Sequence, residues 1–274
     1  MKKVIKAAAA GVLVISLLSA CGGKTQNHSS MAGMEHSSGH EESGEGYAQV
    51  AFAFDGGKAK ANEDSAVTIR ISDSAGNPVK EFKENHEKLL HLIIVDHDLA
   101  TFSHIHPDYK GDGTFTVTAR FPSGGQYKLF ADFVTADGTK ETKSEWVNVE
   151  GAEAEHAPLA VDDKLVRQVD GQEVELTLSS VKAKEEAVLT FDIRDAATKQ
   201  GIDDLQPYLG AVGHVVIISE DGSRYLHVHP VDEKAKGPKA EFMTTFPESG
   251  IYKIWGQFQR DGAVFTVPFV VKAE

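Results

Sequence analysis

The sequence predicts an all-β protein built from two tandem antiparallel β-sandwich domains, and three observations support this. The segment HLIIVDHDLATFSHIHP, from His91, recurs as HVVIISEDGSRYLHVHP, from His214, with its histidines and proline at the same spacing. Downstream, FPSGGQYKLF from Phe121 recurs as FPESGIYKIW from Phe246. Around these segments, short stretches alternate apolar and polar residues and are separated by Gly, Pro, Asp or Asn, as in strands joined by turns. One whole β-domain has therefore been duplicated.

The expected strands of the first copy are short and closely spaced. They cover residues 47–54, 66–72, 90–95, 102–106, 114–121, 126–134 and 140–149. About seven strands in roughly 100 residues are typical of a sandwich of immunoglobulin or cupredoxin type. Helix is nearly absent, and only residues 80–89 have a pattern that allows one or two helical turns. We expect the first repeat at 47–149, a linker at 150–158 and the second repeat at 159–274.

The N-terminal residues 1–21 resemble a bacterial lipoprotein signal. Three lysines precede an apolar stretch at 7–18 that is too short for a comfortable membrane span, and Leu-Ser-Ala-Cys-Gly follows it. In such signals the cysteine, here Cys21, is lipidated and becomes the mature N-terminus. Cys21 is also the only cysteine, so an intrachain disulfide and a cysteine-based zinc cluster are excluded. The alternative is an uncleaved membrane anchor, and in both cases we expect a membrane-tethered, extracytoplasmic protein.

Residues 22–46 are expected to be a disordered tether rich in methionine and histidine. Gly, Ser, His and Glu dominate this stretch, and they cannot bury enough apolar surface to offset the entropy of ordering. Thioethers together with imidazoles suit copper better than zinc, calcium or magnesium. The candidate accessory ligands are Met31, Met34, His36 and His40. The alternative is the loose metal binding that any histidine-rich composition gives.

The charge of the exported chain limits its partners. Without residues 1–21 it has 25 basic and 41 acidic residues, a formal charge of −16. Such an acidic protein is not expected to bind nucleic acid or anionic lipid headgroups. The charge favours solubility outside the cell and the accumulation of cations near the surface.

The histidine spacing in the repeated segment predicts a metal site in each copy. Each segment forms two strands joined by a polar turn, at 96–98 or 220–222. Across such a hairpin, opposed residues differ by an odd number and have Cβ atoms roughly 4.5–5.5 Å apart, while residues two apart share a face. The first histidine of each copy would therefore lie beside the other two, within reach of one ion. The predicted ligands are His91, His104 and His106 in the first copy and His214, His227 and His229 in the second.

The remaining histidines and the metal's identity need separate interpretation. Isolated histidines usually pack or lie on the surface, and we interpret His86, His97 and His156 in this way. We expect copper at the ordered sites, with zinc as the alternative, because three imidazoles suit both ions. Met243 is a candidate soft axial ligand for the second site, although core packing is the favoured role.

The strand that begins with His91 is apolar on both faces. Residues 91, 93 and 95 share one face and residues 92 and 94 the other. A strand that is apolar on both sides is covered on both sides. We therefore expect the outer faces of the two domains to pack together, bringing the two histidine triads near each other around a pseudo-twofold axis.

The segment His-x-His-Pro followed by Phe-Pro-x-x-Gly-x-Tyr-Lys resembles bacterial secreted proteins and lipoproteins of the YtkA-like and FixH-like sort. This resemblance covers both repeats. It implies a β-sandwich and an extracytoplasmic setting, and it supports copper because some of these proteins are associated with copper handling.

Three classes of function are compatible with the sequence. The favoured one is a metal-binding lipoprotein, with copper as the ion that its ligand types favour, that sequesters the ion, delivers it or gives resistance to it, with a metal-transporting or metal-receiving membrane protein as its partner. The second is an enzyme, either a three-histidine hydrolase or hydratase or a copper oxidoreductase, for which the sequence offers no convincing general base. The third is a surface module whose histidines are structural.

Overall fold

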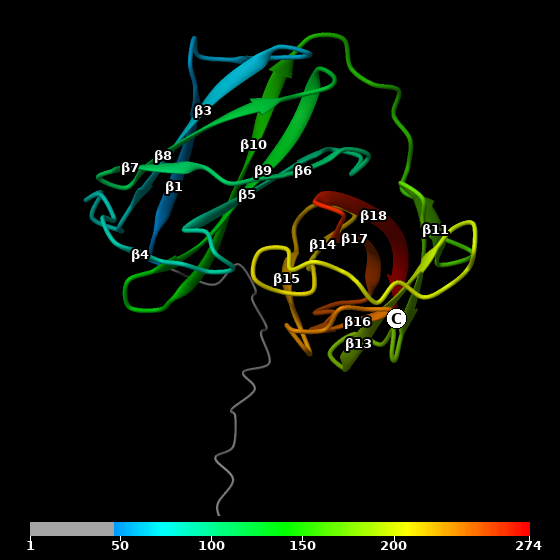
Figure 1. The fold of residues 1–274 in the computed structure, drawn as a ribbon. Coiled ribbons are helices and arrows are strands. Elements are labelled where there is room, and N and C mark those ends of the chain that lie inside the picture. Colours follow the sequence, from blue (N-terminus) through cyan, green and yellow to red (C-terminus); the bar gives the residue numbers. More distant parts are fainter. Residues whose placement is uncertain (1–46) are drawn as a thin grey trace, which may run out of the picture. The chain divides into compact units, whose positions relative to one another are not determined.

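The computed structural model describes residues 47–274, apart from the side chain of His227. The expected signal at 1–21 with Cys21, and the expected ligands Met31, Met34, His36 and His40, lie outside the described residues. Within 47–274 every assigned element is a strand, and the strands form two tandem β-domains, as predicted (Figure 1). No helix in this part of the chain is long and apolar enough to cross a membrane.

The first domain consists of two sheets (Figure 1). Its strands are β1 (Gln49–Phe54), β2 (Ala59–Lys60), β3 (Asp64–Ser72), β4 (Phe82–Lys83), β5 (Leu90–Asp96), β6 (Phe102–Ile105), β7 (Asp108–Gly111), β8 (Thr114–Arg120), β9 (Gly125–Thr135) and β10 (Lys140–Glu150). One sheet has the order β1-β3-β8-β7, and the other has the order β2-β10-β9-β5-β6, with β4 paired to β9. The two sheets enclose a core to which Phe115, Phe121 and Phe133 contribute fully buried rings.

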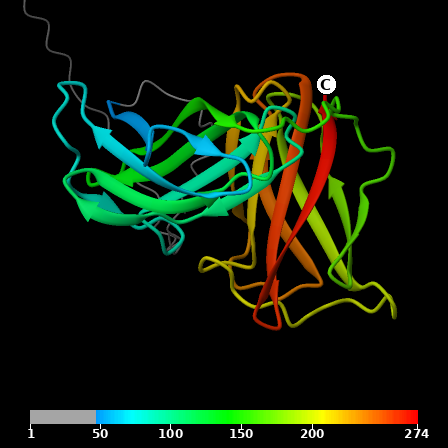
Figure 2. The same ribbon diagram turned by 90° about the horizontal axis from the view of Figure 1, so that it is seen from above.

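The second domain has a related arrangement with fewer strands, and its strands are all connected. Its strands are β11 (Val166–Val169), β12 (Gln172–Leu178), β13 (Glu186–Asp195), β14 (His214–Ser219), β15 (Tyr225–Pro230), β16 (Lys239–Thr245), β17 (Gly250–Arg260) and β18 (Ala263–Ala273). They are connected in one order, β11-β12-β13-β16-β15-β14-β17-β18. Figure 2 shows the last strands of this domain, orange to red, running side by side. β15 joins the two halves because it pairs with β14 and, through His229 and Pro230, with β16.

The two central strands, β5 and β14, are buried along their whole length. Leu92 and Ile94 of β5 belong to the core of the first domain, while Ile93 and Val95 point to the opposite side. This opposite side packs on the second domain. The shared cluster consists of Ile93, Val95, Leu99, Phe130, Val216, Ile218, Tyr225 and Trp255. The outer faces of the two domains are therefore packed together, as the apolar character of β5 on both faces predicted.

Two aromatic pairs across this cluster reveal its pseudo-twofold symmetry. Phe102 stacks on Trp255 with ring centroids 4.8 Å apart, and Tyr225 stacks on Phe130 at 5.1 Å. In the duplication Phe102 corresponds to Tyr225, and Phe130 corresponds to Trp255. Each pair is therefore the symmetry mate of the other.

Two lysine hydrogen bonds between the domains are related by the same pseudo-twofold symmetry. Lys128 donates to the carbonyl of Gly222 at 2.7 Å, and its counterpart Lys253 donates to the carbonyl of Leu99, also at 2.7 Å. Each ammonium lies over an aromatic ring of its own strand, Phe130 at 5.4 Å or Trp255 at 5.5 Å. The contacts that join the domains are thus duplicated along with the domains.

The stretch at 80–89 forms no helical turn, contrary to expectation. β4 occupies part of it, and a tight turn follows in which Asn85 and Lys88 are bridged while His86 and Glu87 have φ of 48° and 64°. Two successive residues with positive φ are typical of a hairpin turn of type I′. The turn places His86 next to β5, where it becomes part of the site described below.

We expect replacement of the buried interdomain tryptophan to destabilise the protein strongly. Trp255→Ala removes a ring that is 3% exposed and should lower the free energy of unfolding by about 3–5 kcal/mol. Trp146→Ala is the control, because Trp146 is 37% exposed and its loss should cost less than about 1 kcal/mol. Chemical denaturation measures both values, and equal losses would contradict a packed interface.

Candidate metal centre

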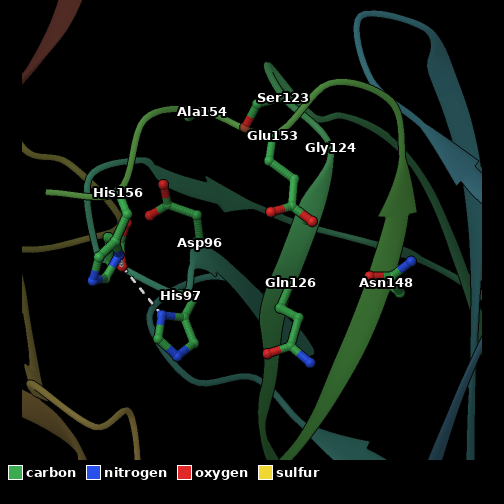
Figure 3. A pocket seen from close by; sticks show the side chains of 11 residues that line it. Asp96, His97, Ser123, Gly124, Gln126, Asn148, Glu153, Ala154 and His156 are labelled. Carbon is green, nitrogen blue, oxygen red and sulfur yellow. Dashed lines mark hydrogen bonds and ion pairs between the residues drawn. The ribbon is translucent and has the colours of Figure 1, made fainter.

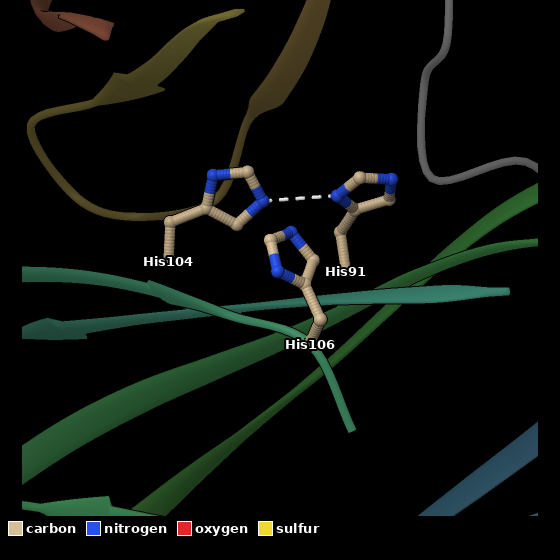
Figure 4. Close-up of side chains that lie close together, drawn as sticks. All are labelled: His91, His104 and His106. Atoms are coloured by element: carbon tan, nitrogen blue, oxygen red, sulfur yellow. Dashed lines mark hydrogen bonds between the residues drawn. The ribbon is translucent and has the colours of Figure 1, made fainter. Parts of the chain in front are cut away.

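Strand pairing brings the first predicted triad together. Ile93 of β5 pairs with His104 of β6, a register that places His91 opposite His106. The ligand nitrogens of the three histidines lie within 4.8 Å of one another (Figure 4). The ring centroids are 4.7–5.2 Å apart. Three imidazoles bound to one tetrahedral ion would have ring centres about 5 Å apart, so the spacing of these rings fits a shared ion.

Hydrogen-bond partners outside the triad fix the tautomers of His91 and His104. His91 Nε2–H donates to the carbonyl of Asn85 at 2.8 Å, which leaves Nδ1 with a lone pair. His104 Nδ1–H donates to Oε1 of Gln257 at 2.6 Å, which leaves Nε2 with a lone pair. The Gln257 amide is held in this orientation because its NH₂ group donates to Thr266 at 3.1 Å.

These tautomers direct two lone pairs at each other. His91 Nδ1 and His104 Nε2 are 2.9 Å apart. Two unprotonated nitrogens at this distance repel unless a proton or a cation lies between them. Imidazoles that bind a metal characteristically donate their other N–H to a carbonyl or carboxylate, which is the role of Asn85 and Gln257 here. The pair is therefore arranged for a shared cation.

His106 supplies a third nitrogen. Its Nε2 is buried and has no hydrogen-bond partner among residues 47–274. Burial, together with the nearby charge of Lys88, lowers the pKa of His106 to about 4, so this ring is neutral at neutral pH, as a metal ligand must be. His106 also lines a cavity of about 290 Å³ that is open to solvent, beside Thr116 and Thr118. This cavity gives an ion a route to the triad.

The histidines of the second domain adjoin the first triad. The His214 ring lies 4.7 Å from His104 and stacks on His91 at 5.4 Å. His229 lies in β15, and His227 occupies the backbone position opposite Val216, but the side chain of His227 lies outside the described residues. Metal binding by the second triad therefore stays a prediction.

Sequence analysis missed His86, which we had interpreted as a packing or surface residue. Its ring lies 5.5 Å from His214, 5.5 Å from His229 and 6.4 Å from His91. No spacing rule links residue 86 to the repeated segment. The signal that would have identified it is the turn at Asn85–Lys88, which returns the chain directly into β5.

The partners on the neighbouring strands were missed as well. Asp132 of β9 pairs with His91, and Gln257 of β17 pairs with His214. Asp132 is 1% exposed, and burial raises the pKa of its carboxyl to about 6. Electrostatic interactions with His91, Lys140 and His86 and a hydrogen bond from Tyr225 partly oppose this rise in the pKa of Asp132. Asp132 is thus a buried carboxylate beside the histidines.

A second group of metal-ligand side chains lies at the surface. His156 Nδ1 and His97 Nδ1 lie 2.6 Å and 3.1 Å from the same Asp98 oxygen (Figure 3). The group borders a cavity of about 400 Å³ that Gln126 and Glu153 also line. Both imidazoles are exposed, and the shared carboxylate attaches the segment after β10 to the β5–β6 turn. This agrees with the interpretation of His97 and His156 as surface residues.

We expect Asp132→Asn to change how the stability of the metal-free protein depends on pH. The pKa of Asp132 in the folded protein, about 6, exceeds its ordinary value of 3.8. The carboxyl therefore contributes stability below about pH 3.8 that is lost as the pH rises through 6. Asparagine avoids this loss, so the variant should gain about 3 kcal/mol over the parent between pH 4 and pH 7. Unfolding with a chelator present measures the gain, and parallel pH profiles would contradict the assignment.

We expect Gln257→Leu to weaken metal binding at the first triad. Without the Gln257 oxygen, His104 can protonate Nε2 and turn its lone pair away from the centre. Loss of such a supporting hydrogen bond typically costs 10–100-fold in affinity. The matched control is Gln259→Leu, two residues along β17, because Gln259 contacts Gln206 and not the histidines. Competition with a chelator measures both affinities, and the same affinity in both variants would be contrary to expectation.

Among solved structures, 116 chains match this one. The adhesin FdeC of Escherichia coli is 16% identical, with a TM-score of 0.28, over 81% of this chain and 63% of that one. Invasin, a bacterial integrin-binding protein, is 14% identical, with a TM-score of 0.24, over 83% and 39%. A membrane-anchored protein from Corynebacterium diphtheriae is 10% identical, with a TM-score of 0.24, over 81% and 56%. The chain thus spans about two fifths to two thirds of these proteins, and TM-scores this low carry no functional argument.

No curated protein matches the sequence. A family described as "Domain of unknown function (DUF8832)" matches it in two stretches, residues 45–151 and residues 167–274. These stretches coincide with the two β-domains and include both copies of the histidine segment. The chain therefore belongs to the DUF8832 family.

Proposed function

We propose that this protein is an extracytoplasmic lipoprotein that binds copper at the histidine centre and sequesters or delivers the ion. The observation that carries the proposal is the contact between Nδ1 of His91 and Nε2 of His104, 2.9 Å apart. The other nitrogens of these two rings donate to Asn85 and Gln257. The buried, unpartnered Nε2 of His106 completes the group. A buried polar group without a partner costs about 1–3 kcal/mol, so a bound ion relieves a penalty that the metal-free protein carries.

The choice of copper rests on the sequence. Met31, Met34, His36 and His40 offer soft ligands ahead of the domains. The resemblance to YtkA-like and FixH-like proteins also favours copper. Three imidazoles suit zinc as well, so zinc is the alternative ion.

The setting that we propose follows from the N-terminal sequence. Lipid on Cys21 would anchor the protein to the outer side of the cell membrane, with the acidic domains in the extracytoplasmic space. The N-terminal methionines and histidines would receive an ion and pass it to the buried centre by ligand exchange. A membrane protein that transports or receives the metal is the proposed partner.

We propose binding and not catalysis. A catalytic three-histidine site keeps an open coordination position for water or substrate. Here the ring of His214 packs against both His104 and His91, with centroids 4.7 Å and 5.4 Å apart, which favours a crowded binding site over one that is open to substrate. A three-histidine enzyme and a surface module with structural histidines are the two alternatives that the following experiment separates.

We expect the parent to bind copper tightly and a variant without the facing pair to lose the first ion. The parent is the full chain in detergent, with Met31, Met34, His36 and His40 changed to serine so that only ordered sites are measured. His91→Ala with His104→Ala should remove one of two tightly bound equivalents. His97→Ala with His156→Ala is the matched control and should bind as the parent does. Copper and zinc content after dialysis, and affinity by chelator competition, are the measurements.

Each result decides between the three functions. Two copper equivalents in the parent, and one in the facing-pair variant, support the proposal. Selective zinc binding would replace it with the hydrolytic or hydratase function. Absence of stoichiometric metal would contradict both the copper-binding and the enzymatic function. The remaining function would be a surface module with structural histidines.

A further inference from the structure

We infer that the second metal site spans the two domains, with His86 of the first domain joining His214 and His229 of the second. This inference rests on the proposed metal-binding function and adds to it a ligand that the duplicated motif does not contain. It makes the bound ion a link between the domains.

The ring geometry supports this ligand set. The His86 ring lies 5.5 Å from His214 and 5.5 Å from His229. With metal–nitrogen bonds of about 2.0–2.1 Å, rings on one tetrahedral ion have centres about 5 Å apart. The corresponding distances in the first triad are 4.7–5.2 Å. The His86 ring therefore lies near the spacing expected for a shared ion with each of the other two rings.

A lysine ammonium lies at the position that we propose for the metal ion. Lys140 of β10 donates to Nε2 of His229 at 3.0 Å, so this nitrogen presents a lone pair towards the first domain. An ion that binds there replaces one positive charge with another. The buried carboxyl of Asp132 lies close enough to interact electrostatically with Lys140 and His86, and in its ionised form it supplies a balancing negative charge. The surroundings thus already accommodate a cation.

The turn that carries His86 holds it rigidly. Asn85 and Lys88 exchange backbone hydrogen bonds of 2.8 Å and 3.1 Å across it. The carbonyl of Asn85 also accepts the hydrogen bond from His91. One turn therefore positions a ligand of each site.

Comparison of the repeats shows that this histidine is specific to the first domain. The corresponding turn of the second domain has Leu209 with φ of 54°, close to the 48° of His86. The backbone conformation is therefore compatible with leucine, and the fold does not require a histidine. A histidine in this turn of the first domain alone points to a role in the site of the second.

Met243, which has a soft thioether, makes the proposed second site differ chemically from the first. Met243 of β16 pairs directly with His229, and paired residues share a face of the sheet. Three residues before the Phe-Pro turn, the first domain has Thr118 in the place of Met243. A thioether beside imidazoles favours copper(I), so the two sites differ in chemistry.

The test replaces His86 by leucine, the residue at the equivalent position of the second domain, Leu209. In the full chain with the N-terminal serine substitutions, His86→Leu should bind the first copper(I) equivalent as the parent does. The second equivalent should bind at least 10-fold more weakly, because one ligand is lost. His97→Leu is the matched control and should bind both equivalents normally. Chelator competition under reducing conditions gives the stepwise affinities.

A second variant tests whether weaker binding by His86→Leu results from loss of the ligand or from misfolding of the turn. His86→Asn retains a residue that tolerates positive φ, and it should weaken the second equivalent in the same way. If both variants bind two equivalents with parental affinity, the inference is overturned while the proposed function stands. If the parent itself binds no copper, the proposed function fails, and the inference fails with it.

Discussion

The central constraint on this molecule is that strands β5 and β14 must be covered on both faces. Each buries one face in its own domain and the other against the partner domain, through the cluster that includes Ile93 and Trp255. Since both strands begin with a histidine, this packing also buries His91 and His214. The hydrophobic requirement therefore determines where the polar chemistry lies, and a single-domain version of this fold would leave the same histidines on an exposed face.

Burial then governs the chemistry of the histidines. In a medium of low polarity every N–H needs an acceptor, so the carbonyl of Asn85 and the side chain of Gln257 take the protons that would otherwise lie inside the triad. The lone pairs that remain converge, and no described residue donates to His106 Nε2. Imidazoles that hold a metal donate their outer N–H in the same way.

Sequence spacing predicted the features that depend on neighbouring strands. It did not predict the residues that reach the site through tertiary contacts. Strand parity placed His91 beside His104 and His106, and the apolar character of β5 on both faces predicted the packing of the domains. Gln257 reaches the first triad from the other domain, and His86 reaches the second triad from a turn with positive φ. Neither is encoded in the thirteen- and fifteen-residue spacings. Asp132 would have been found only by pairing β9 with β5 in the correct register.

The repeats agree in the contacts that join the domains and differ in the residues around the histidines. The contacts that join the domains are conserved as symmetric pairs, such as the two lysine hydrogen bonds of 2.7 Å. Around the histidines the symmetry is broken, since Asp132 corresponds to Gln257 and His86 to Leu209. A duplicated structural feature would keep equivalent residues in equivalent places. The rings of His91 and His214, stacked 5.4 Å apart, therefore lie between surroundings that differ in the two domains.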